Sequence, residues 1–126
     1  MPTNLFADGR MAFLLVLLLS ATVAADPPTS NMPQRGICAH RGASATHPEN
    51  TLVAFAEAIN LGAHMIEFDV ALTRDQHVML MHDATIDRTT KGSGRIADME
   101  SSDLKQLDAG RWKHPRFAGE RIPTLH

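Results

Sequence analysis

The sequence has a single cysteine, no block of like charge, and no apolar run long enough to span a bilayer. One cysteine, Cys38, excludes an internal disulfide, and its place in a candidate strand predicts a small core residue. The 12 basic and 14 acidic side chains give a formal net charge of −2 and are spread along the chain. This balance gives no reason to expect nucleic acid or an anionic membrane surface as a partner.

The longest apolar run, Met11–Leu19, lies near the amino terminus. A helix of this length spans about 14 Å, against about 30 Å of bilayer hydrocarbon, so it cannot cross a membrane alone. Arg10 precedes the run, and Val23 and Ala25 fit the small-residue rule for cleavage. We therefore predict a secretory signal peptide over residues 1–25, a secreted or periplasmic protein, and no stable membrane span after cleavage. An N-terminal anchor or a buried strand is the alternative interpretation.

The rest of the chain divides into a linker and one small domain. Residues 26–34 contain three prolines among Thr, Ser and Asn, a composition typical of linkers. The length of 126 residues and the 44% apolar composition allow one small domain at most, which we place at residues 35–126.

The segment Asn50–Leu61 has the spacing of an amphipathic helix. Asn50 or Thr51 can cap its start, and Gly62 can close its end. Its expected apolar face consists of Leu52, Phe55, Ala56 and Ile59.

Three segments have the composition of strands: Gly36–His40, Met65–Leu72 and Val78–His82. The order strand–helix–strand with short connections predicts an α/β fold with at least one parallel strand pair. Only Thr73–His77 separates the second and third strands, too few residues for a helical crossover. Two paths remain, an extended return that keeps the strands parallel and a hairpin around Arg74-Asp75.

The segment Asp83–His126 is more polar than the part before it. Lys91–Gly94 predicts a flexible turn, and Ser102–Leu107 predicts a short helix with Ser101 nearby as a cap. We therefore expect an ordered, polar inserted segment after the third strand, with one helix of its own.

Two carboxylates, Glu67 and Asp69, alternate with apolar residues in the second predicted strand. They project from the same face, with Cα atoms about 6 to 7 Å apart. Two like charges held there are unfavourable unless a cation neutralises them or one takes a proton. Carboxylate oxygens suit Ca²⁺ or Mg²⁺, so the pair predicts a metal site. The competing interpretation is an edge strand that turns both acids toward solvent.

Two histidines, His40 and His82, each end a predicted strand. Histidine is suited to proton transfer near neutral pH. Two of them beside a divalent cation would serve as acid and base for breaking a phosphate ester, and Arg41 would hold a phosphate oxygen through its planar fork. Taken singly, each histidine has a structural alternative, but their joint placement favours catalysis.

These residues lie in motifs that resemble, in order and spacing, the signature of the glycerophosphodiester phosphodiesterase family. The strongest are His40-Arg41-Gly42, Pro48-Glu49-Asn50-Thr51, Glu67-Phe68-Asp69-Val70 and His82-Asp83. Further landmarks are Thr73-Arg74-Asp75, Asp87-Arg88-Thr89-Thr90, Gly92-Ser93-Gly94, Leu107-Asp108-Ala109-Gly110 and Ile122-Pro123-Thr124-Leu125. The resemblance covers about residues 35–126.

The resemblance implies the N-terminal part of a (β/α)8 TIM-type barrel, with the site at the carboxyl ends of the strands. It implies that His40 and His82 are the general acid and base and that Arg41 binds phosphate. Glu67 and Asp69 would be two ligands of a divalent cation, Ca²⁺ or Mg²⁺. Glu49 would be an acid lining the site that supports metal or substrate.

The same resemblance implies structural roles for three neighbours of these residues. Asn50 and Thr51 would cap the first helix, and Gly42 would let its loop turn tightly. The face formed by Ile66, Phe68, Val70 and Leu72 would pack under outer helices.

The implied reaction is cleavage of a glycerophosphodiester to glycerol 3-phosphate and an alcohol such as choline. A full barrel of this type has about 250 residues, so we expect a truncated barrel that binds metal weakly and turns over little or no substrate. The family's third acidic metal ligand and a site lysine would lie on a later strand. A partner that supplies the missing half barrel is not identifiable from the sequence.

Two other functions compete with this interpretation. A phosphoinositide phospholipase or sphingomyelinase-type lyase would share the barrel and the histidine–metal chemistry, but fits the Pro-Glu-Asn-Thr and His-Asp motifs less well. An exported metal- or phosphate-binding remnant without activity would also fit a truncated chain.

Overall fold

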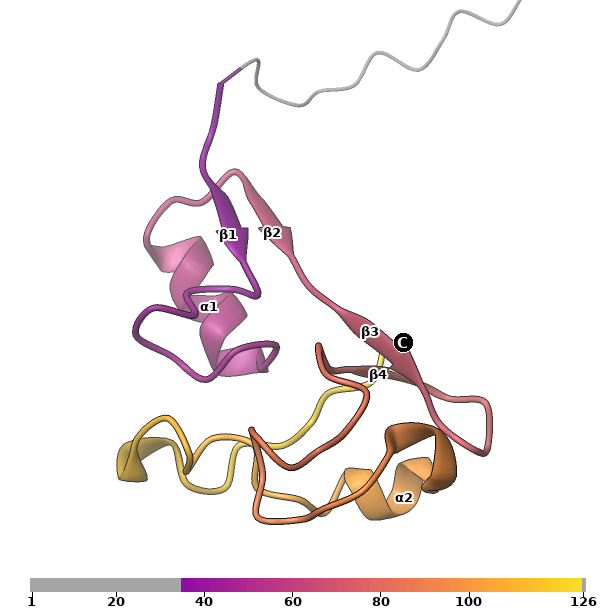
Figure 1. Cartoon of the computed structure of the whole chain (residues 1–126). Coiled ribbons are helices and arrows are strands. Elements are labelled where there is room, and N and C mark those ends of the chain that lie inside the picture. Colours follow the sequence, from indigo (N-terminus) through magenta and orange to yellow (C-terminus); the bar gives the residue numbers. More distant parts are fainter. Residues whose placement is uncertain (1–34, 126) are drawn as a thin grey trace, which may run out of the picture. The chain divides into compact units, whose positions relative to one another are not determined.

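The computed structural model describes residues 35–125 (Figure 1). The predicted signal peptide, residues 1–25, and the linker, residues 26–34, lie outside the described residues. Within residues 35–125 there is no helix with the length and apolar composition needed to span a membrane.

Two small sheets and several short helices make up the described part (Figure 1). Strands β1 and β2 pair in parallel, with His40 opposite Glu67, and β3 and β4 pair antiparallel, with Leu72 opposite Val78. The elements are β1 Cys38–His40, α1 Leu52–Asn60, β2 Met65–Glu67, β3 Val70–Leu72, β4 Val78–Leu80, η1 Ile96–Asp98, α2 Ser101–Leu104 and η2 Pro115–Phe117.

The connections confirm the predicted strand–helix–strand order and settle the path that followed it. Helix α1 links the parallel strands β1 and β2, as expected for an α/β unit. A tight turn joins β3 to β4, in which the Thr73 amide donates to the His77 carbonyl at 3.0 Å. Gln76 sits in the left-handed region of this turn, with φ of 61°. The hairpin is therefore the correct alternative.

The predicted single strand Met65–Leu72 is interrupted between β2 and β3. The interruption falls at Phe68 and Asp69, where the Asp69 amide donates to the Asn50 side chain instead of a neighbouring strand. The Asp69 carbonyl accepts from the Met81 amide at 3.1 Å. At Asp69 the chain therefore leaves the β1–β2 sheet and enters the β3–β4 sheet.

The apolar face of that segment is largely open in the described residues. Phe68, Val70 and Leu72 are 39%, 52% and 48% exposed, so the expectation that they pack under helices is not met here. Phe68 alone has an aromatic neighbour from α1, Phe55, with ring centroids 6.0 Å apart.

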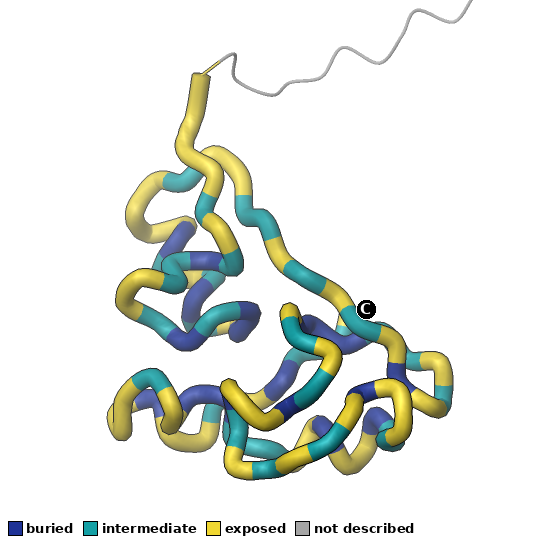
Figure 2. The backbone as a smooth tube through the Cα atoms, in the orientation of Figure 1, coloured by how far each residue is buried: buried dark blue, intermediate teal, exposed yellow. Residues whose placement is uncertain are grey.

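Helix α1 begins and ends as predicted but buries a different face. The Thr51 hydroxyl accepts from the Ala54 amide, and Gly62, with φ of 77°, follows the helix. The buried positions are Ala54 and Ala58, whereas Leu52 and Ile59 of the predicted face are 67% and 66% exposed. Figure 2 shows buried stretches in α1 and in the loop before it.

The reason is the close approach of the loop after β1 to the helix. The Ala43 amide donates to the Ala54 carbonyl at 2.9 Å. A Cβ added at Gly42, where φ is 79°, would lie 2.8 Å from the Ala54 carbonyl carbon. Only small side chains allow this approach, so the alanine face of α1 meets the loop.

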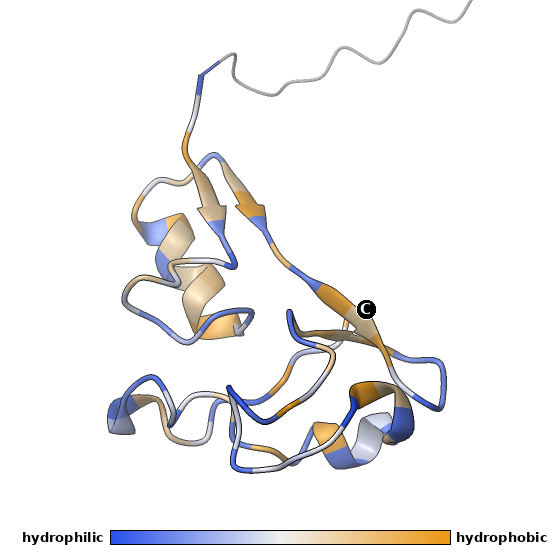
Figure 3. Ribbon diagram, in the orientation of Figure 1, coloured by the Kyte–Doolittle hydropathy of each residue, from blue (hydrophilic) through white to orange (hydrophobic). Residues whose placement is uncertain are grey.

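The predicted polar excursion is folded and builds the main hydrophobic cluster together with β4. Figure 3 shows hydrophobic positions scattered among polar ones along this segment. The end of the chain runs beside β4, with the Leu80 amide donating to the Pro123 carbonyl at 2.9 Å. The buried cluster consists of Met79, Met81, Ile86, Ile96, Leu104, Ala109 and Ile122.

The short helix of the excursion starts earlier than predicted. Helix α2 covers Ser101–Leu104 with Glu100 at the N-cap, so Ser101 is not the cap. The Ser101 amide and hydroxyl both donate to the Asp75 carboxylate, at 2.9 and 2.8 Å. An acceptor from the β3–β4 turn thus takes the place of a local capping side chain.

The prediction that Cys38 is a core residue is wrong. Cys38 is exposed and lies opposite Met65, itself 36% exposed, in the β1–β2 pair. In the described residues β1 and β2 form a sheet of two strands, each three residues long, which offers little surface to bury the thiol.

Candidate active site

The candidate site begins at Arg41, directly after β1. Arg41 has φ of 57°, a left-handed conformation that is uncommon for a residue with a side chain. Its amide donates to both the carbonyl and the carboxylate of Glu67, at 2.8 and 3.1 Å, and its carbonyl accepts from the Asn50 amide. These bonds fix the turn that carries the side chain away from the strand.

The Arg41 guanidinium lies between two carboxylates, and the whole side chain is 17% exposed. One terminal nitrogen, Nη1, donates to Glu49 Oε1 at 3.1 Å. Its Nε lies 3.0 Å from Asp69 Oδ2, but this buried N–H has no hydrogen-bond partner. The contact between Arg41 Nε and Asp69 Oδ2 is therefore an ion pair without a hydrogen bond, because the N–H does not point at the oxygen.

Asp69 is held by Asn50 through two reciprocal hydrogen bonds. The Asn50 amide nitrogen Nδ2 donates to Asp69 Oδ2, and Asn50 Oδ1 accepts from the Asp69 backbone amide, both at 3.1 Å. Asn50 is 3% exposed and left-handed, with φ of 56°. The predicted capping role of Asn50 is therefore wrong, since Thr51 caps α1 and Asn50 orients the carboxylate.

Glu67 and His40 lie opposite each other at the ends of β2 and β1. His40 Nε2 is 3.9 Å from Glu67 Oε2, and the two side chains are 68% and 43% exposed. The predicted metal pair thus meets around Arg41, with Glu67 bonded to its amide and Asp69 beside its side chain.

The second histidine, His82, follows β4 and contacts its own neighbour in sequence. His82 Nδ1 is 2.6 Å from Asp83 Oδ1. Arg88 donates from Nε to Asp83 Oδ2 at 2.7 Å. These hydrogen bonds, first from Arg88 and then from His82, lower the pKa of Asp83 to about 2. The carboxylate is therefore ionised at neutral pH and accepts the Nδ1 hydrogen of the imidazole.

Glu49 connects the two halves of the site. Arg88 donates from Nη1 to Glu49 Oε2 at 2.8 Å and from Nη2 to Glu49 Oε1 at 2.7 Å. The hydrogen bonds from Arg88 are the main cause that lowers the pKa of Glu49, and the charges of Arg88 and Arg41 act in the same direction against burial. Glu49 is 12% exposed and forms ion pairs with both Arg41 and Arg88, so it holds the two arginines in position.

All six predicted site residues belong to one continuous series of polar contacts. The series runs from His40 through Glu67, Arg41, Glu49, Arg88 and Asp83 to His82, with Asp69 beside Arg41.

Sequence reasoning assigned no site role to Asn50, Asp83 or Arg88. The His-Asp pair and the Asp87–Thr90 motif contained two of these residues. Glu49 and Arg88 are 39 positions apart, and no sequence pattern indicated that their side chains meet.

The carboxylates at Arg41 fit part of a metal-ligand set. In residues 35–125 no group of three or more His, Cys, Asp or Glu side chains is arranged to hold a metal ion. The bonds given above engage Oε2 of Glu67 and Oδ2 of Asp69, and each carboxylate has a second oxygen to offer. Hard oxygen donors suit Ca²⁺ or Mg²⁺, which take six or more ligands, so water and further groups would complete the shell.

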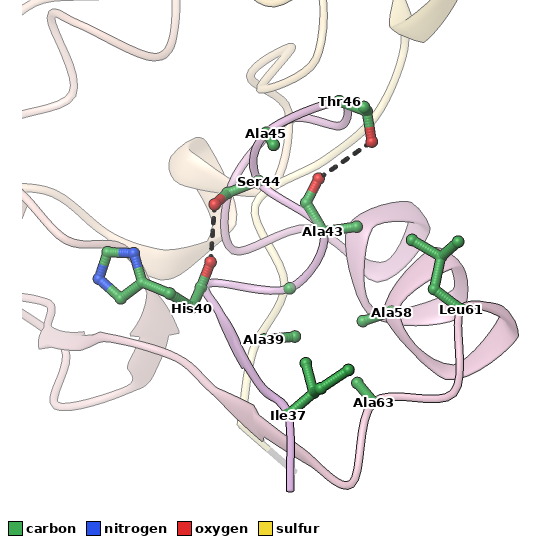
Figure 4. A pocket seen from close by; sticks show the side chains of 11 residues that line it. Ile37, Ala39, His40, Ala43, Ser44, Ala45, Thr46, Ala58, Leu61 and Ala63 are labelled. Atoms are coloured by element: carbon green, nitrogen blue, oxygen red, sulfur yellow. Dashed lines mark hydrogen bonds between the residues drawn. The ribbon is translucent and has the colours of Figure 1, made fainter.

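A pocket of about 430 Å³ lies beside β1, and His40 is among the residues that line it. Figure 4 shows the ring pointing away from the apolar side chains that line it, among them Ile37, Ala39 and Leu61. With no acid or arginine in its lining, this pocket lacks the chemistry of the candidate site.

Comparison with known proteins identifies similar proteins among the phosphodiesterases. The model of the glycerophosphoryl diester phosphodiesterase family matches residues 40–126. A glycerophosphodiester phosphodiesterase from Caldanaerobacter subterraneus is 52% identical over 90 residues, which are 71% of this chain and 37% of that protein. One from Bacillus subtilis is 36% identical over 121 residues, 89% of this chain and 41% of that protein.

Solved structures agree with the sequence relatives. A glycerophosphodiester phosphodiesterase from Agrobacterium tumefaciens is similar with a TM-score of 0.69 and 45% identity, over 71% of this chain and 38% of that one. A phosphodiesterase from Oleispira antarctica, in complex with the product sn-glycerol-3-phosphate, is similar with a TM-score of 0.70 and 44% identity, over 75% and 37%.

The chain spans 37% to 41% of the length of these relatives. The matches confirm the predicted fold class, an α/β unit that is part of a (β/α)8 barrel. With a family match over residues 40–126 and an arginine–carboxylate site at the ends of its strands, this chain belongs to the glycerophosphoryl diester phosphodiesterase family.

Proposed function

We propose that the chain supplies catalytic residues for hydrolysis of glycerophosphodiesters to glycerol 3-phosphate and an alcohol. The observation that carries this proposal is the contact series that joins His40 and His82 through Arg41, Glu49 and Arg88. The product complex of the Oleispira antarctica relative supports the choice of substrate.

Arg41 would bind the phosphoryl group. Its Nη1 and Nε face Glu49 and Asp69, which leaves Nη2 to meet a phosphoryl oxygen. The guanidinium is held on two sides and is pre-organised, so little side-chain entropy is lost when substrate binds. The fixed positive charge would stabilise negative charge that builds on the phosphoryl oxygens.

The two histidines would transfer the protons. Because Asp83 accepts from His82 Nδ1, Nε2 is the atom that exchanges a proton with the reacting group. His40, which lies beside Glu67 and is largely exposed, would exchange a proton with the other of the two reacting oxygens, those of the attacking hydroxyl and the departing alkoxide. One imidazole removes the proton of the attacking hydroxyl, and the other protonates the departing alkoxide.

Glu67 and Asp69 would hold a divalent cation, Ca²⁺ or Mg²⁺. A bound cation would offset charge on the phosphoryl oxygens during hydrolysis. Since residues 35–125 place no third such ligand beside the pair, we propose weak metal binding and low turnover for these residues alone. We also propose export, which is supported by the signal-peptide pattern of residues 1–25.

The test is release of glycerol 3-phosphate from glycerophosphocholine by the full chain with Ca²⁺ or Mg²⁺. We expect a low rate that falls at least 100-fold in His82→Ala and in His40→Ala, given the usual contribution of general acid–base catalysis of about 10² to 10⁴. His64→Gln is the control, because His64 accepts from the Ile37 amide outside the contact series. Equal rates in the parent and His82→Ala, or a preference for intact phospholipid, would contradict the proposal.

A further inference from the structure

We propose that Arg88 is a positioning residue for His82: its guanidinium ties Asp83 to Glu49 and so keeps the imidazole with Nδ1 protonated and Nε2 free to react. The link to catalysis rests on the proposed function, whereas the geometry itself is testable without substrate.

Arg88 makes four hydrogen bonds, two to each of two carboxylates. Nε and Nη2 donate to the two oxygens of Asp83, at 2.7 and 3.2 Å. Nη1 and Nη2 donate to the two oxygens of Glu49, at 2.8 and 2.7 Å. Both carboxylates are thus gripped in a two-point, planar arrangement that lysine cannot reproduce.

The hydrogen bonds to Asp83 and Glu49 leave Arg88 poorly suited to bind the phosphate itself. A guanidinium has five N–H donors, and four donations go to protein carboxylates. Arg41, by contrast, has one terminal nitrogen outside its contacts with Glu49 and Asp69. The two arginines therefore have different roles: Arg41 binds the substrate, and Arg88 holds Asp83 and Glu49 in position.

Asp83 can orient the His82 imidazole only if its own carboxylate is held in place. Asp83 and His82 are adjacent in sequence, and their side chains are 29% and 42% exposed. A carboxylate in that position rotates freely unless a second partner fixes its plane. Arg88 supplies this partner and also keeps the carboxylate ionised, since its hydrogen bonds are the largest cause that lowers the pKa of Asp83.

Trp112 helps to keep the partly exposed Arg88 in place. The Trp112 ring centroid lies 5.9 Å from Arg88 Cζ, within the range of a cation–π contact. Trp112 is itself anchored, because its Nε1 donates to the Ala109 carbonyl at 2.8 Å. The excursion after β4 therefore contributes a side chain that supports Arg88.

The first experiment uses the unmodified chain and nitrogen-resolved NMR. We expect His82, when neutral, to be protonated predominantly at Nδ1, in contrast to the same residue in urea-unfolded chain. We expect the Arg88 Nε hydrogen to exchange with water at least tenfold more slowly than that of Arg116. Fast Arg88 exchange, or a His82 tautomer ratio equal to that in urea, would overturn the proposal without any variant.

The second experiment compares Arg88→Met and Arg88→Lys with Arg74→Met as the matched control. Arg74 also makes two hydrogen bonds to a carboxylate, from Nε and Nη2 to Glu100, but outside the site. Both Arg88 variants should shift the His82 tautomer ratio toward the unfolded value, whereas Arg74→Met should leave it unchanged. An unchanged ratio in a folded Arg88 variant would refute the proposal.

Turnover separates this inference from the proposed function. If the parent hydrolyses glycerophosphocholine, Arg88→Met should lower kcat at least tenfold and change KM less than twofold, because Arg41 still binds phosphate. A large rise in KM with kcat unchanged would instead make Arg88 a substrate ligand. No hydrolysis by the parent, together with the expected tautomer shift, would remove the proposed function and leave the His82 geometry standing.

Discussion

Asn50 and Asp69 exchange two hydrogen bonds of 3.1 Å across 19 positions of the sequence. The pair fixes the carboxylate beside Arg41 and takes the Asp69 amide out of the strand ladder. Asn50 is 3% exposed, so neither of its polar atoms has easy access to water as a substitute partner. The position of the candidate metal ligand thus depends on one buried amide.

Asn50→Asp is expected to destabilise the folded chain by about 1–3 kcal/mol, the usual cost of an unsatisfied or repelled buried polar group. The new carboxylate would face Asp69 Oδ2, to which the Asn50 Nδ2 group donates in the parent. Aspartate tolerates the left-handed backbone at this position, which isolates the electrostatic effect. Urea unfolding measures the loss, and Asn60→Asp at the exposed end of α1 should change the midpoint far less.

Gly42→Ala and Gly62→Ala form a matched pair with nearly equal backbone angles, φ of 79° and 77°. A Cβ at Gly42 would meet Ala54 at 2.8 to 2.9 Å, whereas one at Gly62 would meet nothing within 4 Å. Gly62→Ala should therefore cost only the left-handed backbone term, about 1–2 kcal/mol. Gly42→Ala should cost about 1–3 kcal/mol more, because α1 must move away from the loop. Equal unfolding midpoints for the two variants would show that the loop does not press on the helix.

The hydrogen bonds that Asp75 accepts should make the folded chain less stable in acid. The Thr73 hydroxyl is the main cause that lowers the pKa of Asp75, followed by hydrogen bonds from Ser101. A lowered pKa in the folded state means that this stabilisation is present above the unfolded value of about 3.9 and is lost as the pH falls toward the folded value. Asp75→Asn should therefore flatten the fall of the urea midpoint below about pH 4. Asp98→Asn, on the exposed surface of η1, should keep the steep acid dependence of the parent.

The sequence was sufficient to predict the strand–helix–strand order and the approximate places of α1 and the strands, while the catalytic and metal-binding roles of the site residues remain predictions. Periodicity located α1 and the parallel strands because side-chain spacing reflects helix and strand geometry directly. It failed for the buried face of α1, because Ala54 and Ala58 are chosen by how closely the loop approaches and not by hydrophobicity. The roles of Asn50 and Arg88 were also out of reach, because each bonds to a residue many positions away.

Glu67 and Asp69 should bind one divalent cation together, and a double-mutant cycle tests this directly. Glu67→Gln and Asp69→Asn are each expected to weaken Ca²⁺ binding at least tenfold in calorimetry with the full chain, because each removes one anionic oxygen donor. If both side chains hold the same ion, the double variant should lose less than the sum of the two single losses, because the second substitution acts on a site that is already weakened. Glu57→Gln is the control, since Glu57 lies on α1 and is not a member of the contact series that joins the site residues. Fully additive losses would mean that the two acids contribute to Ca²⁺ binding independently, and unchanged binding in both single variants would remove the metal from the proposed reaction.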